Sequence, residues 1–302
     1  MNETWLIAGG NGQLGRALRR NLAQRGINYF APSSRELDIR CNPQVLKETT
    51  LLMPNVIVNA AAWTDVDGAE SDPNGAFEVN VQGALNLALA AKSVNAVYAY
   101  ISSDYVFSGN KEIPWKENDL QDPISIYGKS KANGEVSILN AYKERSYVFR
   151  TAWLYSPWGR NFVKTMTKLA INSNHEVKVV NDQFGQPTSA IDLANQIIDT
   201  ISLEIPFGIY HATNSGQATW FEFAKRIFEL SEVSTARLLP ISSSDFQSKA
   251  VRPKFSILGH ESWENISQAG KQVPGMRDWK SALAFDFPEI LMQVRSEMSS
   301  AV

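Results

Sequence analysis

The chain has 302 residues, of which 44% are hydrophobic and 20% charged, as in a soluble globular protein of one large domain or two ordinary ones. Its formal net charge of −2 gives no reason to expect nucleic acid or a membrane surface as a partner, and no apolar run is long enough to span a membrane. The single cysteine, Cys41, excludes an intramolecular disulfide framework and fits a reducing, cytoplasmic location.

Short apolar runs alternate with helical periodicity in the first half of the chain. Leu14, Leu18 and Leu22 recur every four residues, which predicts a helix over 13–25 with one apolar face. The other predicted helices are 75–94 and 127–142, and the predicted strands are 5–8, 27–31, 56–59, 97–102 and 147–150. This alternation predicts an α/β fold of the Rossmann type, a doubly wound parallel sheet with helices on both faces.

The second half is less regular. Helices are predicted at 162–171, 191–201 and 220–230, strands at 177–180 and 209–212, and a loop at 240–254. We therefore expect a Rossmann domain over residues 1–152 and a smaller C-terminal substrate-binding α/β lobe over 153–302. Residues of about 177–203 are expected to return to the first domain.

A glycine-rich turn follows the first predicted strand and precedes the first predicted helix. Gly9 permits the tight turn, Gly12 lets the backbone approach a pyrophosphate, and Gly15 lets the helix pack close to the strand. The exposed N–H groups and the helix dipole then meet phosphate charge. Residues 1–152 are therefore predicted to bind NAD(P) through Gly9, Asn11, Gly12, Gln13, Leu14 and Gly15.

The adenosine end of this site is less sharply marked. The second strand ends at Ala31 without the carboxylate that would bind the ribose of NAD. Arg35 and the serines before it favour the 2′-phosphate of NADPH, with NADH as the alternative. Asp38 and Ile39 are expected to flank the adenine. The small residues Ala60, Ala61 and Ala62 leave room for a cofactor at the end of the third strand.

Three residues form a candidate set for proton delivery. Tyr127 and Lys131 lie four apart, so a helix places them on one face. A neighbouring ammonium lowers the pKa of a phenol, which would make Tyr127 a workable acid near neutral pH. Ser103 ends the fourth predicted strand, where its hydroxyl can orient a substrate oxygen. Together with the glycine turn, this set predicts hydride transfer from a nicotinamide to a ketone.

Several strings resemble the dTDP-4-dehydrorhamnose reductase family of the extended short-chain dehydrogenase/reductase superfamily. They begin at residue 5 and continue to about residue 260. The strings are those at 59–70, 102–107, 149–155 and 181–188, and the later Arg252-Pro253-x-x-Ser256-x-Leu258. The resemblance implies reduction of the C4 ketone of dTDP-4-dehydro-6-deoxy-L-mannose to dTDP-L-rhamnose, the last step of dTDP-rhamnose synthesis for surface polysaccharide.

The resemblance also implies residue roles. Tyr127 would give the proton, Lys131 would support it and hold the nicotinamide ribose, and Ser103 would tune the ketone oxygen. Thr64 falls beside the cofactor and the sugar. Asp104, Tyr105 and Trp153, with Ser103 and Tyr127, fall where the family contacts the sugar nucleotide.

Two positions depart from the family pattern. Ala17 stands where some relatives carry a glutamate implicated in a metal-bridged dimer, so no metal site is predicted, and a homodimer is left open. Trp63 replaces a residue that is often histidine beside the active site. The three histidines are scattered and do not indicate a metal site.

Alternatives remain. A dehydratase would need a glutamate after Asp104, where Tyr105 stands, and a Cys-His epimerase pair is not available because Cys41 lies on the adenosine side. The sequence does not distinguish dTDP-4-dehydrorhamnose reduction from the reduction of a related dTDP-6-deoxyhexose. A non-catalytic NADP-binding subunit, similar to the regulatory subunit of methionine adenosyltransferase, is a second class that the complete set of Ser103, Tyr127 and Lys131 disfavours.

Overall fold

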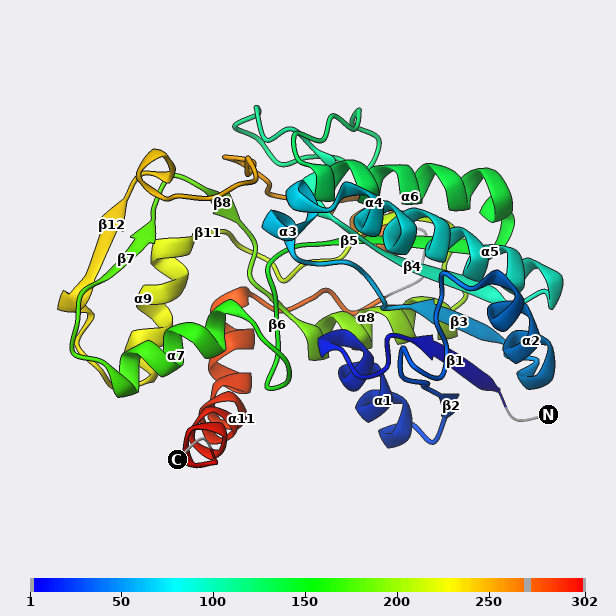
Figure 1. The fold of residues 1–302 in the computed structure, drawn as a ribbon, viewed down its shortest axis with the longest axis horizontal. Helices are drawn as coiled ribbons and strands as arrows, with labels where there is room; N and C mark the ends of the chain where they lie inside the picture. Colours follow the sequence, from blue (N-terminus) through cyan, green and yellow to red (C-terminus); the bar gives the residue numbers. More distant parts are fainter. Residues whose placement is uncertain (1–2, 269–272, 301–302) are drawn as a thin grey trace.

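A parallel six-stranded sheet organises the first part of the computed structural model, which describes residues 3–268 and 273–300 (Figure 1). The strand order is β10-β5-β4-β3-β1-β2, and every neighbouring pair is parallel. The strands are β1 (Thr4–Ala8), β2 (Asn28–Phe30), β3 (Val56–Asn59), β4 (Val97–Ser103), β5 (Ser146–Thr151) and β10 (Gly208–His211). The predicted Rossmann-type sheet is therefore confirmed.

Helices cover both faces of this sheet. Trp5, Ile7 and Phe149 pack toward α1 and α8, whereas Leu6, Ile57 and Tyr98 pack toward α2, α5 and α6. Neighbouring residues of one strand thus serve opposite cores, which explains why the strands read as continuous apolar runs. The helices of this part are α1 (Gln13–Gln24), α2 (Asn42–Leu52), α3 (Val66–Ser71), α4 (Pro73–Phe77), α5 (Ala84–Ser93), α6 (Ile126–Tyr142), α8 (Ala190–Ser202) and α10 (Glu261–Gln268).

The predicted helix over 75–94 is divided into three pieces. A π-helical turn, η1 (Glu78–Gly83), separates α4 from α5. Asn80, in this turn, is buried and donates its amide to the Ser130 hydroxyl at 2.9 Å. A continuous apolar stripe in the sequence does not reveal such a change in helical pitch. Short 3-10 turns are η2 (Asp104–Val106) and η3 (Lys143–Arg145).

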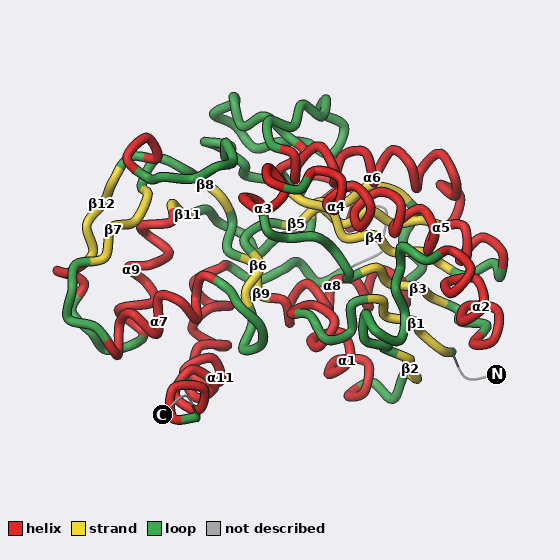
Figure 2. The backbone as a smooth tube through the Cα atoms, viewed as in Figure 1, coloured by secondary structure: helices red, strands yellow, loops and turns green. Residues whose placement is uncertain are grey.

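The second lobe has three separate pairs of short strands around its own core. Figure 2 shows these pairs lying apart from the large sheet. They are β6 (Leu154–Tyr155) with β9 (Thr188–Ser189), β7 (Val177–Val180) with β12 (Leu238–Ile241), and β8 (Phe184–Gly185) with β11 (Ala218–Thr219). The remaining elements are α7 (Phe162–Asn172), α9 (Trp220–Leu230), η4 (Thr235–Arg237), η5 (Ser243–Asp245) and α11 (Trp279–Ser299).

The expectation for residues 177–203 needs a correction. The strand β7 pairs with β12 and does not enter the large sheet. By contrast, α8 packs against α1, and the following strand, β10, joins β5. The chain returns to the first sheet only after β7, because Val177 and Val179 face the core of the second lobe. The boundary near residue 152 stays a prediction.

No helix within residues 3–268 and 273–300 is long and apolar enough to cross a membrane. Residues 1–2, 269–272 and 301–302, which fall inside the two predicted domain ranges, lie outside the described part of the chain.

Candidate active site

A cleft of about 670 Å³ lies at the carboxyl ends of the parallel strands, between the sheet and the second lobe. In the sheet, β2 lies on one side of β1 and β3 on the other, so the strand order reverses direction at β1. Open α/β sheets bind their ligands at such a reversal. Twelve predicted site residues line the cleft: Gly12, Gln13, Leu14, Ala60, Ala62, Thr64, Ser103, Asp104, Tyr105, Tyr127, Lys131 and Trp153. The predicted catalytic and sugar-contacting residues are thus brought together.

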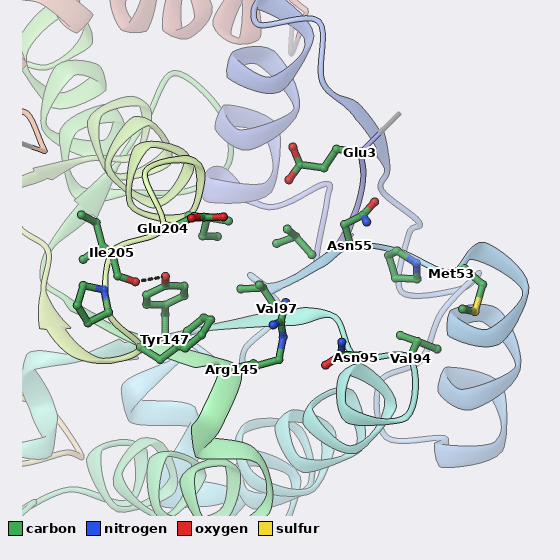
Figure 3. Close-up of a pocket in the computed structure, with 15 residues that line it drawn as sticks. Glu3, Met53, Asn55, Val94, Asn95, Val97, Arg145, Tyr147, Glu204 and Ile205 are labelled. Carbon is green, nitrogen blue, oxygen red and sulfur yellow. Dashed lines mark hydrogen bonds between the residues drawn. The ribbon is translucent and has the colours of Figure 1, made fainter. Parts of the chain in front are cut away.

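A second, larger hollow of about 820 Å³ lies at the amino ends of the same strands (Figure 3). Its wall includes Val97 and Tyr147, whose hydroxyl donates to the carbonyl of Ile205. None of the predicted site residues lines it. The smaller cleft therefore holds the candidate chemistry.

The glycine turn has the close packing that a dinucleotide site requires. A Cβ on Gly9 would lie 2.5 Å from the Ala61 nitrogen, and a Cβ on Gly15 would lie 2.2 Å from the Gly9 carbonyl oxygen. Gly9 also has a φ of +78°. Gly12 caps α1 without any side chain, and the first turn of α1 carries no acidic residue. The helix N-terminus is consequently open to a phosphate, so these residues fit a pyrophosphate.

Seven predicted cofactor residues do not line the cleft: Gly9, Asn11, Gly15, Arg35, Asp38, Ile39 and Ala61. Gly9 instead packs against both Gly15 and Ala61 beneath the turn. Ile39 is buried in the core and meets the helical segment at Gly83. Asp38 pairs with Arg40 at 2.8 Å, and this hydrogen-bonded ion pair lowers the pKa of Asp38.

A carboxylate, that of Glu36, lies close to the site that was predicted for the 2′-phosphate around Arg35. Arg35 is exposed, but the Ser33 backbone N–H donates to the Glu36 carboxylate at 2.7 Å. This hydrogen bond lowers the pKa of Glu36. The carboxylate therefore stays charged close to the serines that are predicted to meet a 2′-phosphate.

Tyr127 and Lys131 lie one turn apart on α6, but their electrostatics differ from the expectation. Lys131 is buried; its Nζ donates to the Ile101 carbonyl at 2.6 Å and lies 4.3 Å from the centre of the Tyr100 ring. Burial lowers the pKa of Lys131 to about 7. Burial also raises the pKa of Tyr127 to about 12, so the expected lowering by the ammonium does not occur in this structure. Tyr127 is a protonated phenol at neutral pH.

Ser103 and Asp104 form a buried polar pair at the end of β4. The Ser103 hydroxyl donates to Asp104 Oδ1 at 2.9 Å and accepts from the Tyr105 backbone N–H at 3.2 Å. Burial raises the pKa of Asp104 to about 6, against the hydrogen bond from Ser103, which lowers it. A hydrogen bond with Ser103 also lowers the pKa of Tyr127, which links the phenol to this pair.

An aromatic wall closes the second-lobe side of the cleft. Trp153 has a φ of +44°, a strained value for a side chain of this size. Its ring stacks on Trp220 with ring centres 3.5 Å apart and planes 10° apart. Gly185 permits this position because a Cβ there would lie 2.3 Å from the Trp153 ring. The wall is therefore fixed by packing on both sides.

Several residues that line the cleft were not predicted from the sequence, among them Thr151, Arg160, Trp220 and Arg252. Arg252 pairs with Asp67 on α3, with Nη2 2.7 Å from Oδ2. The Arg252-Pro253 string is part of the resemblance to the family. No local sequence pattern, however, predicts that this loop contacts α3. Such a contact between residues 185 positions apart depends on the tertiary fold.

The two positions that depart from the family pattern lie away from the cleft lining. Ala17 is fully buried in the core, and Trp63 donates its indole N–H to the Asp65 carbonyl at 2.9 Å. Among the residues that the structure describes, no group of three His, Cys, Asp or Glu side chains is placed to hold a metal ion.

The RmlD substrate binding domain family matches residues 3–287. A dTDP-4-dehydrorhamnose reductase from Streptomyces griseus is 39% identical over 95% of this chain and 93% of its own length. A dTDP-4-keto-6-deoxy-D-glucose reductase from Streptomyces niveus is 36% identical over 95% of this chain and 98% of its own length.

A solved structure is similarly close. The crystal structure of dTDP-4-dehydrorhamnose reductase from Bacillus anthracis in complex with NADP has a TM-score of 0.89 and 37% identity. The alignment covers 96% of this chain and all of that chain.

Proposed function

This chain belongs to the RmlD substrate binding domain family, and from that membership we propose that it is an NADPH-dependent dTDP-4-dehydrorhamnose reductase. The reaction is reduction of the C4 ketone of dTDP-4-dehydro-6-deoxy-L-mannose to dTDP-L-rhamnose. The observation that carries the proposal is that the open N-terminus of α1 and the set Ser103, Tyr127 and Lys131 line one cleft.

The cofactor site is proposed at the glycine turn. The free backbone N–H groups at the start of α1 bind the pyrophosphate, and the close contact of Gly9 with Ala61 keeps side chains out of its path. Bound NADPH supplies the hydride that goes to C4. Lys131 holds the nicotinamide ribose from the floor of the cleft, where the Ile101 carbonyl fixes its amine.

The proton goes to the oxygen at C4. Tyr127 donates it, since a phenol with a pKa of about 12 is fully protonated at pH 7. Ser103 positions the same oxygen, because its hydroxyl is held at the end of β4 by Asp104 and the Tyr105 backbone. Lys131 supports this transfer through the ribose that it holds; its amine does not lower the pKa of Tyr127.

The sugar nucleotide is proposed to lie between these groups and the second lobe. Asp104, Tyr105 and Trp153 are the sugar-contacting side chains, and the fixed Trp153–Trp220 stack limits the space for ring substituents. Thr64 also lines the cleft, and we propose that it meets cofactor and sugar.

Turnover tests the proposal against its two alternatives. The chain is mixed with NADPH and the 4-keto sugar nucleotide, and the product is identified by NMR. Consumption of NADPH with formation of dTDP-L-rhamnose supports the proposal. A different C4 epimer assigns the chain to a related dTDP-6-deoxyhexose, as the name of the Streptomyces niveus relative suggests. Binding of NADPH without turnover assigns it to the non-catalytic class.

The setting of the protein is part of the proposal. A nucleotide-sugar substrate and a single exposed cysteine, Cys41, suit a reducing cytoplasmic compartment. A homodimer is proposed as the assembly, and light scattering in solution tests it.

A further inference from the structure

A buried ion pair lies behind the catalytic face of α6. Arg150 on β5 donates from Nη2 to Glu135 Oε2 at 2.7 Å and from Nε to Oε1 at 2.9 Å. The two side chains are only 2% and 1% exposed. Neither residue lines the cleft, so neither touches a ligand there.

The Glu135 carboxylate joins the helix that carries Tyr127 to the strand that carries Ser103. It accepts the Ser102 hydroxyl at 2.5 Å, and Ser102 immediately precedes Ser103 on β4. It also accepts the Gln121 amide at 2.5 Å, from the loop that leads into α6. A carboxylate with partners on three segments fixes their relative positions.

Glu135 also lies one helical turn beyond Lys131, so Tyr127, Lys131 and Glu135 follow one face of α6. Burial lowers the pKa of Lys131, and the charge of Glu135 opposes that change by raising it. The other ionisable groups nearest this face of α6 are Tyr100 on β4, Asp104 in η2 and Arg150 on β5.

The remaining charged groups on elements packed against α6 lie toward the surface. Asp67 and Glu78 have side chains that are 40% and 62% exposed, Lys92 and the η3 residues Lys143 and Glu144 are also exposed, and Arg145 in η3 is half-buried. Glu70 accepts the Ile126 backbone N–H at the start of α6. Glu135 is therefore the buried carboxylate that acts on the Lys131 amine.

We propose that Glu135 is a positioning residue, which holds α6 against β4 through Ser102 and keeps the Lys131 amine in its charged form. This inference rests on the proposed reductase function and extends it to a residue outside the cleft. Arg150 holds the Glu135 carboxylate in place. The negative charge of that carboxylate stabilises the Lys131 ammonium one helical turn away. Without that charge, the buried amine loses its proton at a lower pH.

The test is the pH dependence of Glu135→Gln, which keeps the shape of the side chain and removes its charge. Two quantities are measured: kcat for the 4-keto sugar, and the dissociation constant for NADPH. We expect the alkaline limb of both profiles to move down by about one pH unit. Glu135→Asp, which restores a carboxylate, is expected to keep the limb at its parental position. Glu144→Gln, at an exposed glutamate just beyond α6, is the matched control.

Because Glu135→Gln leaves Arg150 buried without a charged partner, the variant Glu135→Gln/Arg150→Gln is measured beside it. A limb that stays at its parental position in a folded variant, with or without a uniform loss of kcat, overturns the proposal. If the parental chain does not turn over the keto sugar, the reductase function fails, while the NADPH-binding profile still decides the role of Glu135.

Discussion

The rings of Tyr105 and Tyr127 meet edge to face, with ring centres 5.6 Å apart and planes at 76°. This contact uses the ring of Tyr127, while a hydrogen bond with Ser103 links its hydroxyl to the cleft. The position of the ring therefore does not depend on the proton that the hydroxyl would give.

Tyr127→Phe should separate chemistry from binding. Because the ring contact with Tyr105 is kept, NADPH should bind as in the parent, while kcat falls by about 10²–10⁴-fold. Stopped-flow absorbance measures turnover, and fluorescence titration measures binding. Tyr142→Phe, at the other end of α6, removes a hydroxyl that donates to Ala96 and should leave kcat near the parental value. Parental turnover in Tyr127→Phe would rule out this proton donor.

Gly15→Ala should damage the cofactor site and the fold together. The added Cβ would lie 2.2 Å from the Gly9 carbonyl oxygen, so the turn must move away from its phosphate-binding geometry. We expect a loss of about 1–3 kcal/mol in the free energy of unfolding and weaker NADPH binding. Gly275→Ala, where no atom lies within 4 Å of the added Cβ, is the control. Equal behaviour of the two variants would contradict the proposed turn.

Asp67→Asn should act on the substrate more than on the fold. Arg252, which lines the cleft, pairs with Asp67, and a half-exposed pair of this kind contributes little stability. Loss of the partner lets Arg252 leave the cleft wall, so KM for the sugar nucleotide should rise about tenfold, or ~1.4 kcal/mol. The surface pair Arg226–Glu229 offers Glu229→Gln as a control with unchanged KM. An unchanged KM in Asp67→Asn would show that the bridge does not shape the sugar site.

His211 should make stability depend on pH in the acid range. Burial and the charge of Arg150 lower the pKa of His211 from 6.5 to about 3. Below pH 6.5, therefore, His211 binds a proton in the unfolded chain but stays neutral in the folded chain. The contribution of His211 to the free energy of unfolding is complete above pH 6.5. It is lost as the pH falls toward 3, by on the order of a few kcal/mol.

His211→Asn should flatten this pH dependence, as measured by urea unfolding between pH 7 and pH 4. The carboxyl groups of Asp104 and Asp286, whose pKa values burial raises to about 6, act in the opposite direction. The comparison is therefore between variant and parent at each pH. His175→Asn, at an exposed site, is the control. An equal slope in His211→Asn and parent would contradict a neutral buried His211.

Local periodicity predicted the large sheet because each of its strands is a short apolar run between helices. The glycine turn and the Tyr127–Lys131 spacing were visible for the same reason: each is set within a few residues of chain. The pairing of β7 with β12 was not visible, since neither the valine-rich β7 nor β12, with the sequence Leu-Leu-Pro-Ile, carries a mark of its partner. Arg252 was missed as a lining residue because a long-range ion pair positions it.

The electrostatics of the site could not be predicted from spacing alone. Four residues of separation place Lys131 beside Tyr127, but burial decides both pKa values, and burial follows from packing of α6 on β4. The Glu135–Arg150 pair similarly depends on α6 and β5 meeting in the interior.

The most direct test of hydride transfer follows the hydrogen itself. NADPH deuterated at C4 of the nicotinamide is incubated with the chain and dTDP-4-dehydro-6-deoxy-L-mannose, and the product is examined by NMR. We predict dTDP-L-rhamnose carrying deuterium at C4 of the sugar. A sugar nucleotide that returns with its ketone intact, while NADPH stays bound and unoxidised, would contradict it.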